Sequence, residues 1–228
     1  MASSPKLDRY RQAAPQLYEL LRDKIVSLEY LPGAVLSRAD ISAQFDVSQT
    51  PVREALLKLA EERLVDVFPQ AATRVSLIDT RVAEEAHFLR RAIELEIVRD
   101  LSLQAPQGLV AALEDLVARQ AQLRDRHDYD AFVVADQEFH RCMYAAVGKE
   151  ELWKLVRSRS GHIDRLRRLH LPAGDKMARI VGDHGRIVQA IVARDPGAAQ
   201  DRLREHLSGT LESMDRIRAE YPDYFAAA

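Results

Sequence analysis

The chain has 228 residues, 47% of them hydrophobic and 30% charged, with a formal net charge of −2 at pH 7. This composition is typical of a folded soluble domain pair, and the slight negative charge argues mildly against a dedicated, strongly basic nucleic-acid binder. No apolar run is long enough to cross a membrane, the N-terminus lacks a secretory signal, and Cys142 is the only cysteine. We therefore expect a cytoplasmic protein without disulfides.

The first part of the chain predicts an arm and three helices. Apolar residues recur at helical spacing after Pro15, and the Pro32-Gly33 pair is a strong turn signal that ends this first helix. Ser37 followed by Asp40 resembles a capping box at the start of the second helix. In chain order, these elements are a mobile arm over 1–14 and helices over 15–28, 38–45 and 49–63.

Residues 41–56 carry the most informative pattern in the sequence: a short helix, a tight turn and a second helix that opens with small polar residues. This is the layout of a helix-turn-helix whose second helix enters the DNA major groove with its N-terminal end. The first turn of that helix would attract a phosphate, and an arginine one turn further on can reach a guanine edge. The candidate DNA-binding residues are Arg38, Ser48, Gln49, Thr50, Arg53 and Arg74.

After the helix-turn-helix the periodicity changes to alternation. The segments 64–68 and 73–77, separated by a turn at 69–72, predict a β-hairpin that completes a winged helix over 15–78. From Asp79 onward the pattern indicates only helices, at about 79–103, 106–126, 128–147, 150–170, 174–194 and 196–219. The expected fold class is therefore mainly α, with an N-terminal winged helix-turn-helix and a C-terminal all-α helical bundle over 79–228.

Two segments resemble a known family. Residues 17–77, with Leu31-Pro32-Gly33 and the stretch 47–56 (VSQTPVREAL), resemble the winged-helix domain of the GntR family of bacterial transcription regulators. Residues 80–220 resemble the FCD effector domain of its FadR-type subfamily. The resemblance implies a homodimer that binds double-stranded operator DNA and a small carboxylate effector, and no contact with a membrane.

The chain departs from the family's pattern at two places. Gln49 stands where arginine is usual, and because glutamine can bond bidentately to adenine, a changed operator sequence is implied. Ala71-Ala72 stands where the tip of the wing usually has a glycine. We therefore expect this wing tip to approach the DNA backbone less closely.

Four residues of the second domain form a candidate metal site. Asp136 and His140 are four residues apart on one predicted helix, so they share a face, and a bundle can bring His184 and His206 to the same place. Three imidazoles and one carboxylate suit Zn²⁺, Ni²⁺ or Mn²⁺. In a chain with seven histidines, spacing alone is a weak signal and favours solvated or core-capping histidines over a metal site. The resemblance implies a divalent metal, with zinc expected first, because FCD domains bind metal through an Asp-x-x-x-His pair and two later histidines.

The resemblance also implies an effector pocket beside the metal, where FCD domains commonly hold a small organic acid. Arg90 matches a pocket arginine of the family, although an exposed pair with Glu94 explains it equally well. The basic stretch 157–165 either lines this pocket or forms a solvated face. We expect three of the other histidines to lie at the surface, namely His87, His127 and His170.

The expected function is a ligand-responsive transcription regulator, most commonly a repressor in this family, and not an enzyme. Two alternatives stay open on the sequence. The helical domain can serve dimerisation alone, or the metal can activate water in a hydrolase. The hydrolase lacks a base beside the metal, because Glu138 lies two residues from both Asp136 and His140 and so points away from them.

Overall fold

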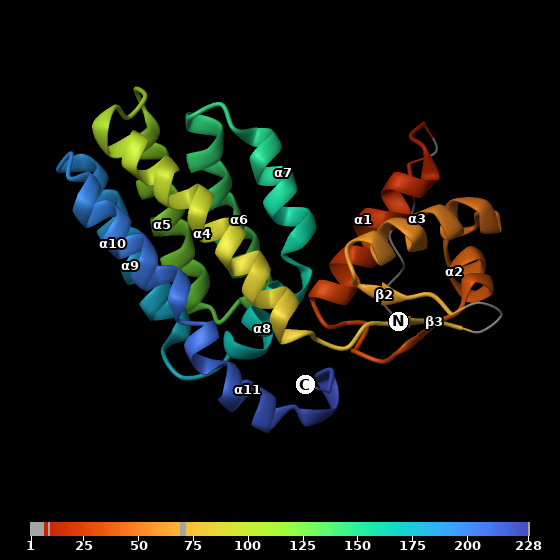
Figure 1. Ribbon diagram of the computed structural model, residues 1–228. Helices are drawn as coiled ribbons and strands as arrows, with labels where there is room; N and C mark the ends of the chain where they lie inside the picture. The colour runs from red at the N-terminus through yellow and green to blue at the C-terminus, as the bar shows by residue number, and fades with distance from the viewer. Residues whose placement is uncertain (1–6, 9, 69–71, 228) are drawn as a thin grey trace. The chain divides into compact units, whose positions relative to one another are not determined.

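The computed structural model describes residues 7–8, 10–68 and 72–227, and these divide into two compact units (Figure 1). The first unit comprises Met1–Thr80 with Arg218–Ala228, and the second is Arg81–Ile217. The predicted boundary near residue 79 falls at this division, whereas residues 218–228 group with the first unit instead of with the bundle. Within the described ranges, no helix is long and apolar enough to span a membrane.

The first unit is a winged helix-turn-helix, as the sequence predicts. Its three helices pack around one core, and an antiparallel sheet in the order β1-β3-β2 closes it. The elements are α1 Ala13–Val26, β1 Val35–Leu36, α2 Arg38–Phe45, α3 Gln49–Glu61, β2 Val65–Asp66 and β3 Thr73–Val75. Strand β1 was not predicted, because two residues are too few to show an alternation; it pairs Leu36 with Thr73.

The ends of the first helix differ from the prediction. Helix α1 begins at Ala13, inside the expected arm, and ends at Val26 because Leu28 adopts a left-handed conformation with φ of 65°. Leu17, Leu21 and Ile25 are fully buried along one face of α1, as their spacing predicts. Of the predicted arm, residues 1–6 and 9 lie outside the described residues, as do residues 69–71 of the wing turn.

A C-terminal segment completes the first unit. After α11 (Met214–Glu220), the chain forms a short turn of 3-10 helix, Pro222–Tyr224, and pairs with Ile78 in an isolated parallel bridge. The Ile78 amide donates to the carbonyl of Tyr224 at 2.8 Å, and the Ala226 amide donates to the carbonyl of Ile78 at 3.0 Å. Ile78 is completely buried. The sequence showed no strand signal after residue 79, because a single bridge leaves no periodic pattern.

The second unit is a bundle of seven main helices in the described part of the chain (Figure 1). Two of the predicted helices are each divided. The helix expected over 150–170 breaks at Ser160, and the one expected over 196–219 ends at Ser208. The bundle helices are α4 Thr80–Leu103, α5 Leu109–Asp125, α6 Tyr129–Ala146, α7 Glu150–Arg159, α8 Gly161–His170, α9 Lys176–Val192 and α10 Pro196–Ser208.

The core of the bundle lies where α5, α6, α9 and α10 pack against one another. Val98, Leu113, Phe139, Ile187 and Leu203 are among its buried members. Burial of side chains of this size stabilises a fold by about 1.5–3 kcal/mol each relative to exposure, which makes the bundle a rigid frame for the polar residues embedded in it. The candidate metal site lies within this frame.

Candidate DNA-binding surface and metal centre

The second helix of the helix-turn-helix, α3, presents a polar face to solvent. Gln49, Thr50 and Arg53 are exposed, and Ser48 precedes them as the N-cap residue. The opposite face is buried in the core of the first unit through Val52, Ala55, Leu56 and Leu59. The N-terminal turn of such an amphipathic helix is accessible for insertion into the major groove of DNA.

Polar contacts fix the orientation of α3. Glu62, at its C-terminal end, accepts hydrogen bonds from the Tyr18 hydroxyl and from Arg22 Nε, the latter at 2.8 Å, and both partners lie on α1. The Arg22–Glu62 pair is largely buried. At the turn, Ser42 of α2 donates to the carbonyl of Val47. The exposed face of α3 is therefore held rigidly by α1 and α2.

The other two candidate DNA-binding residues are also exposed. Arg38 is the first residue of α2, and Arg74 lies in β3 with its Nη1 3.3 Å from the carbonyl oxygen of Gly33. All six candidates therefore lie at the surface of one unit.

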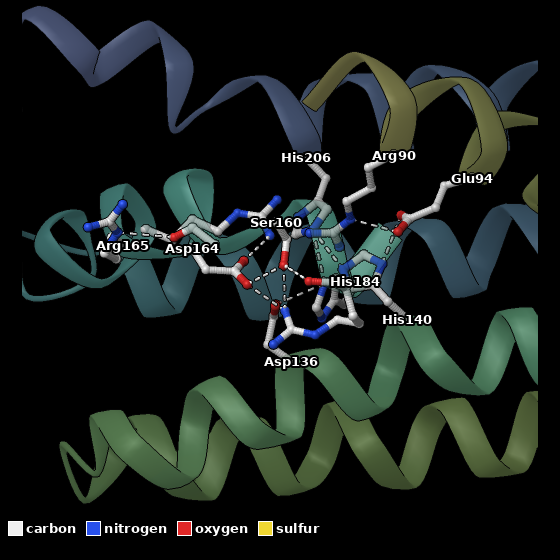
Figure 2. Close-up of polar contacts among 12 residues, drawn as sticks. Arg90, Glu94, Asp136, His140, Ser160, Asp164, Arg165, His184 and His206 are labelled. Atoms are coloured by element: carbon white, nitrogen blue, oxygen red, sulfur yellow. Dashed lines mark hydrogen bonds and ion pairs between the residues drawn. The ribbon is translucent and has the colours of Figure 1, made fainter. Parts of the chain in front are cut away.

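In the second unit, the four predicted metal ligands converge. Asp136, His140, His184 and His206 each offer one ligand atom, and these atoms all lie within 4.8 Å of one another. Nε2 of His206 is 3.2 Å from Nε2 of His184 and 3.2 Å from Nε2 of His140. Asp136 Oδ1 is 3.6 Å from Nε2 of His184. Figure 2 shows these side chains meeting between the bundle helices.

Each imidazole turns its other nitrogen, Nδ1, toward an acceptor. His140 Nδ1 is 3.0 Å from Glu94 Oε2, and His206 Nδ1 is 3.6 Å from Asp183 Oδ2. These acceptors lie on α4 and α9. A carboxylate can only accept, so both contacts favour the tautomer with the ring proton on Nδ1.

The third acceptor is an amide whose orientation is fixed by its own neighbour. Gln120 Nε2 donates to the carbonyl of Ala135 at 3.1 Å, so its Oε1 is the atom that faces His184 Nδ1 at 2.8 Å. His184 Nδ1 is therefore protonated as well. Phe139 stacks on the His184 ring with centroids 3.9 Å apart, which holds the plane of the ring.

This arrangement fits a metal ion. With the ring protons on Nδ1, the Nε2 lone pair of His206 points at those of His184 and His140 across 3.2 Å, which is unfavourable unless a cation lies between them. In a tetrahedral zinc site with bonds of about 2.0–2.1 Å, neighbouring ligand atoms are about 3.3 Å apart. Outward hydrogen bonds from ligand histidines to carboxylate or carbonyl oxygens are the usual support of such a site. The residues present would accommodate a divalent cation.

The electrostatics keep the His140 and His184 rings neutral. Burial, together with Arg90, lowers the pKa of His140 to about 4, although Glu94 acts in the opposite direction. Burial, followed by the neighbouring His206 and His140, lowers the pKa of His184 well below its ordinary value. Metal ligation requires neutral imidazole, so His140 and His184 need release no proton at neutral pH.

Arg90 lies beside this cluster and is buried, in contrast to the exposed pair considered from the sequence. Its Nε donates to Glu94 Oε1 at 2.6 Å, and Glu94 is fully buried. Burial alone would raise the pKa of Glu94, but Arg90 and His140 lower it well below its ordinary value, so Glu94 is ionised. One carboxylate thus links Arg90 to a candidate metal ligand.

A pocket opens next to Asp136, the most exposed of the four candidate ligands. Arg90 and Asp136 form one side of it, and α7 and α8 form the other. The arginines of the basic stretch have different places: Arg157 lines the pocket, Arg165 is fully buried and Arg159 is exposed. The remaining lining residues are Gln137, Trp153, Val156, Ser160, Asp164 and Arg167.

The sequence did not reveal several residues of this site. The imidazoles are supported by Glu94, Gln120 and Asp183. Neither the spacing of these residues in the sequence nor their type indicates this role. Trp153 also lines the pocket. Of the histidines expected at the surface, His127 is exposed but His87 and His170 are buried, because α4 and α8 turn these positions toward the interior.

An exposed helix-turn-helix on a winged unit, followed by a helical unit with a buried polar site, defines the class of two-domain DNA-binding regulators. The comparisons with known proteins agree with it. The model of the family described as bacterial regulatory proteins, gntR family, matches residues 13–75, and that of the FCD domain matches residues 85–209.

Similar proteins extend over nearly the whole chain. An uncharacterized HTH-type transcriptional regulator in an unstable DNA locus of Streptomyces ambofaciens is 37% identical over 210 residues, covering 92% of this chain and 88% of its own. The HTH-type transcriptional repressor RspR of Escherichia coli (strain K12) is 28% identical over 226 residues, covering 99% of each chain. The solved structure of E. coli McbR/YncC has a TM-score of 0.77 at 20% identity, covers 92% of this chain and 99% of that one, and shows the likeness of fold.

The chain belongs to the GntR family of bacterial regulatory proteins and carries an FCD domain. It is a DNA-binding transcription regulator and not an enzyme. The hydrolase alternative is therefore excluded, and Glu138 pairs with Arg141 at the surface instead of supporting the metal cluster.

Proposed function

We propose that this regulator is a repressor whose FCD domain holds a divalent metal ion, zinc first among the candidates, and through it senses a small organic acid. The observation that carries the proposal is the convergence of three Nε2 atoms and one carboxylate, each imidazole with its Nδ1 directed at an outer acceptor. The metal would be held by Asp136, His140, His184 and His206, and when bound it would offer open coordination positions to a ligand carboxylate.

The position of the pocket supports the sensing of an acid. It adjoins Asp136, and Arg90 lies on its wall. Arginine is suited to a carboxylate because its planar donors match both oxygens. An acid that reached the metal from this pocket would place its oxygens near Arg90.

On the DNA side, we propose contacts from Ser48, Gln49, Thr50 and Arg53 in the major groove, with Arg38 and Arg74 contacting the phosphate backbone. One winged helix makes few contacts, so a homodimer on a two-fold operator provides the affinity. Such a protein acts in the cytoplasm, where the operator is.

Regulation would follow from linkage between the two sites. An acid that binds one packing of the bundle more tightly shifts the population toward that packing, and the affinity for the operator changes with it. A repressor released by its ligand is one in which the acid favours the state that binds DNA weakly. The name of a similar protein, the repressor RspR, supports repression.

The first test is the metal content of the purified protein, followed by thermal unfolding with a panel of carboxylic, hydroxy and sugar acids. We expect about one metal per chain and a rise in Tm with at least one acid, because a ligand that binds only the folded state stabilises it. His184→Asn should lose the metal and the acid response. His127→Asn, the same change at an exposed histidine, should lose neither. Equal metal content in the two variants would contradict the proposal.

A further inference from the structure

The pocket beside the metal cluster is lined by more charged side chains than a site for a single anion requires. Figure 2 shows Asp164 and Ser160 on one side of the cluster and Glu94 on the other. Asp164 is buried, with 7% of its side chain exposed, yet it lines the pocket together with three arginines. Those arginines are Arg90, Arg157 and Arg167.

Each of these arginines already contacts a carboxylate of the protein. Arg90 pairs with Glu94, while Arg157 Nη1 lies 2.5 Å from Asp164 Oδ2 and Arg167 Nη1 lies 3.5 Å from Asp164 Oδ1. Asp164 thus bridges two arginines through its two oxygens, in the way a carboxylate ligand would. Burial, followed by the charge of Arg90, lowers the pKa of Arg167 to about 10, whereas Asp164 acts in the opposite direction.

Asp164 is held in place by contacts with Ser160, at the break between α7 and α8. The hydroxyl of Ser160 lies 2.6 Å from Asp164 Oδ2 and 2.9 Å from the carbonyl oxygen of Arg157. The Asp164 amide donates to the carbonyl of Ser160 at 2.8 Å. A serine hydroxyl that contacts the carbonyl of the preceding turn competes with the helix, which is consistent with the break at this residue. The carboxylate is therefore anchored by both side chain and backbone.

We propose that Asp164 determines which acids this pocket accepts, because it occupies, at Arg157 and Arg167, the position that a second ligand carboxylate would need. The pocket then selects acids with one carboxylate and a hydroxylated far end over dicarboxylic acids. This inference rests on the proposed function, in which the first carboxylate binds at the metal.

The group at the far end of the acid, a hydroxyl or a second carboxylate, explains which acids the pocket selects. A hydroxyl can donate to Asp164 and accept from an arginine at once, so it fits the existing pairs without separating them. A second carboxylate only accepts, and it meets the Asp164 charge at short range in a site with little water. Like charges brought together in this way repel, and we expect a preference of at least about tenfold for the acid that ends in a hydroxyl.

The test uses matched acids that differ only in whether the chain ends in CH₂OH or in COO⁻: glycerate with tartronate, and gluconate with glucarate. Their affinities for the metal-loaded protein are measured by calorimetry in the wild type and in Asp164→Asn. We expect the wild type to prefer the monocarboxylate by at least about tenfold, and Asp164→Asn to lose or reverse that preference. Asp201→Asn, which removes an exposed carboxylate paired with Arg204 on α10, should keep it.

Three other outcomes are informative. A wild type that binds both members of a pair equally, or an Asp164→Asn variant with an unchanged ratio, overturns the role of Asp164 while leaving the sensing function intact. A metal-loaded wild type that binds none of the acids overturns the sensing function, and this inference with it. If Asp164→Asn does not fold, Asp164→Ser removes the same charge and puts a hydroxyl in place of the carboxylate, and the same change in ratio is expected.

Discussion

Replacing Gln120 with methionine would remove one hydrogen-bond acceptor from the metal cluster while leaving the size of the side chain almost unchanged. Gln120 is fully buried; its Oε1 accepts from His184 Nδ1 at 2.8 Å, and its Nε2 donates to the carbonyl of Ala135 at 3.1 Å. Methionine provides neither interaction. The His184 ring would then be oriented by stacking on Phe139 alone.

The expected loss of metal affinity follows from this geometry. Removing the outer partner of a ligand histidine costs about 10–100-fold in metal affinity, or about 1.4–2.8 kcal/mol. Stability of the metal-free protein should fall by a separate amount, about 1–3 kcal/mol for each buried polar group left unpaired. Metal affinity is measured by competition with a chromophoric chelator, and stability by thermal unfolding after metal removal.

A second variant separates the two effects. Gln120→Glu keeps an oxygen that can face His184 but removes the donor to Ala135, so it should lose stability without losing metal affinity. If Gln120→Met binds the metal as tightly as the wild type, the orientation of His184 by Gln120 does not matter for metal binding. If both variants lose affinity equally, the contact with Ala135 is responsible and the reasoning on the acceptor fails.

Three further predictions concern the rest of the molecule. Arg53→Ala should cost about 1–3 kcal/mol of binding free energy on an operator selected from random DNA by the wild type, with no change in thermal unfolding; an unchanged affinity would remove Arg53 from the DNA contact. Glu62→Gln should destabilise the first unit by about 1–3 kcal/mol in urea unfolding, because Arg22 loses its buried carboxylate partner, and an unchanged midpoint would show that the pair is dispensable. The metal-free protein should lose stability as pH falls from 6.5 toward 4, on the order of 1–2 kcal/mol per buried histidine by pH 5. Burial first, and nearby cations next, lower the pKa of His87, His140 and His170 to about 4 in the folded protein. The unfolded chain therefore takes up protons at a higher pH than the folded protein does, and unfolding is favoured. A flat profile between pH 7 and pH 5 would contradict this linkage.

The sequence predicted best where local signals decide the structure. Helix α2 runs from Arg38 to Phe45 as predicted, because the Ser37 hydroxyl caps it at the Asp40 amide and Asp46 ends it in a left-handed conformation. Helix α3 also begins at Gln49 as predicted, although its N-cap residue Ser48 makes no side-chain capping bond. The convergence of Asp136, His140, His184 and His206 was also expected, although the step from their spacing to a shared site depended on the family resemblance.

Features that depend on contacts between distant helices were not predictable in the same way. The apolar pattern of α7 and α8 continues through Ser160, and the single glycine beside the break, Gly161, is too weak a signal to divide a predicted helix by itself. Asp164 has the appearance of a residue on a solvated basic face, since its arginine neighbours surround it in sequence. Gln120 and Asp183 reach the site only because α5 and α9 pack beside α6 and α10. Long-range packing is the information that a single sequence lacks.

The bridge between Ile78 and the tail limits how freely this regulator can be recombined with others. Its DNA-binding unit is discontinuous in sequence, because Tyr224 and Ala226 bond the backbone of a residue that immediately precedes the helical domain. A chimera that joined residues 1–80 to a foreign effector domain would expose Ile78 and leave its amide and carbonyl without these partners. A chimera of this DNA-binding unit with a different effector domain therefore needs to retain the native segment 218–227.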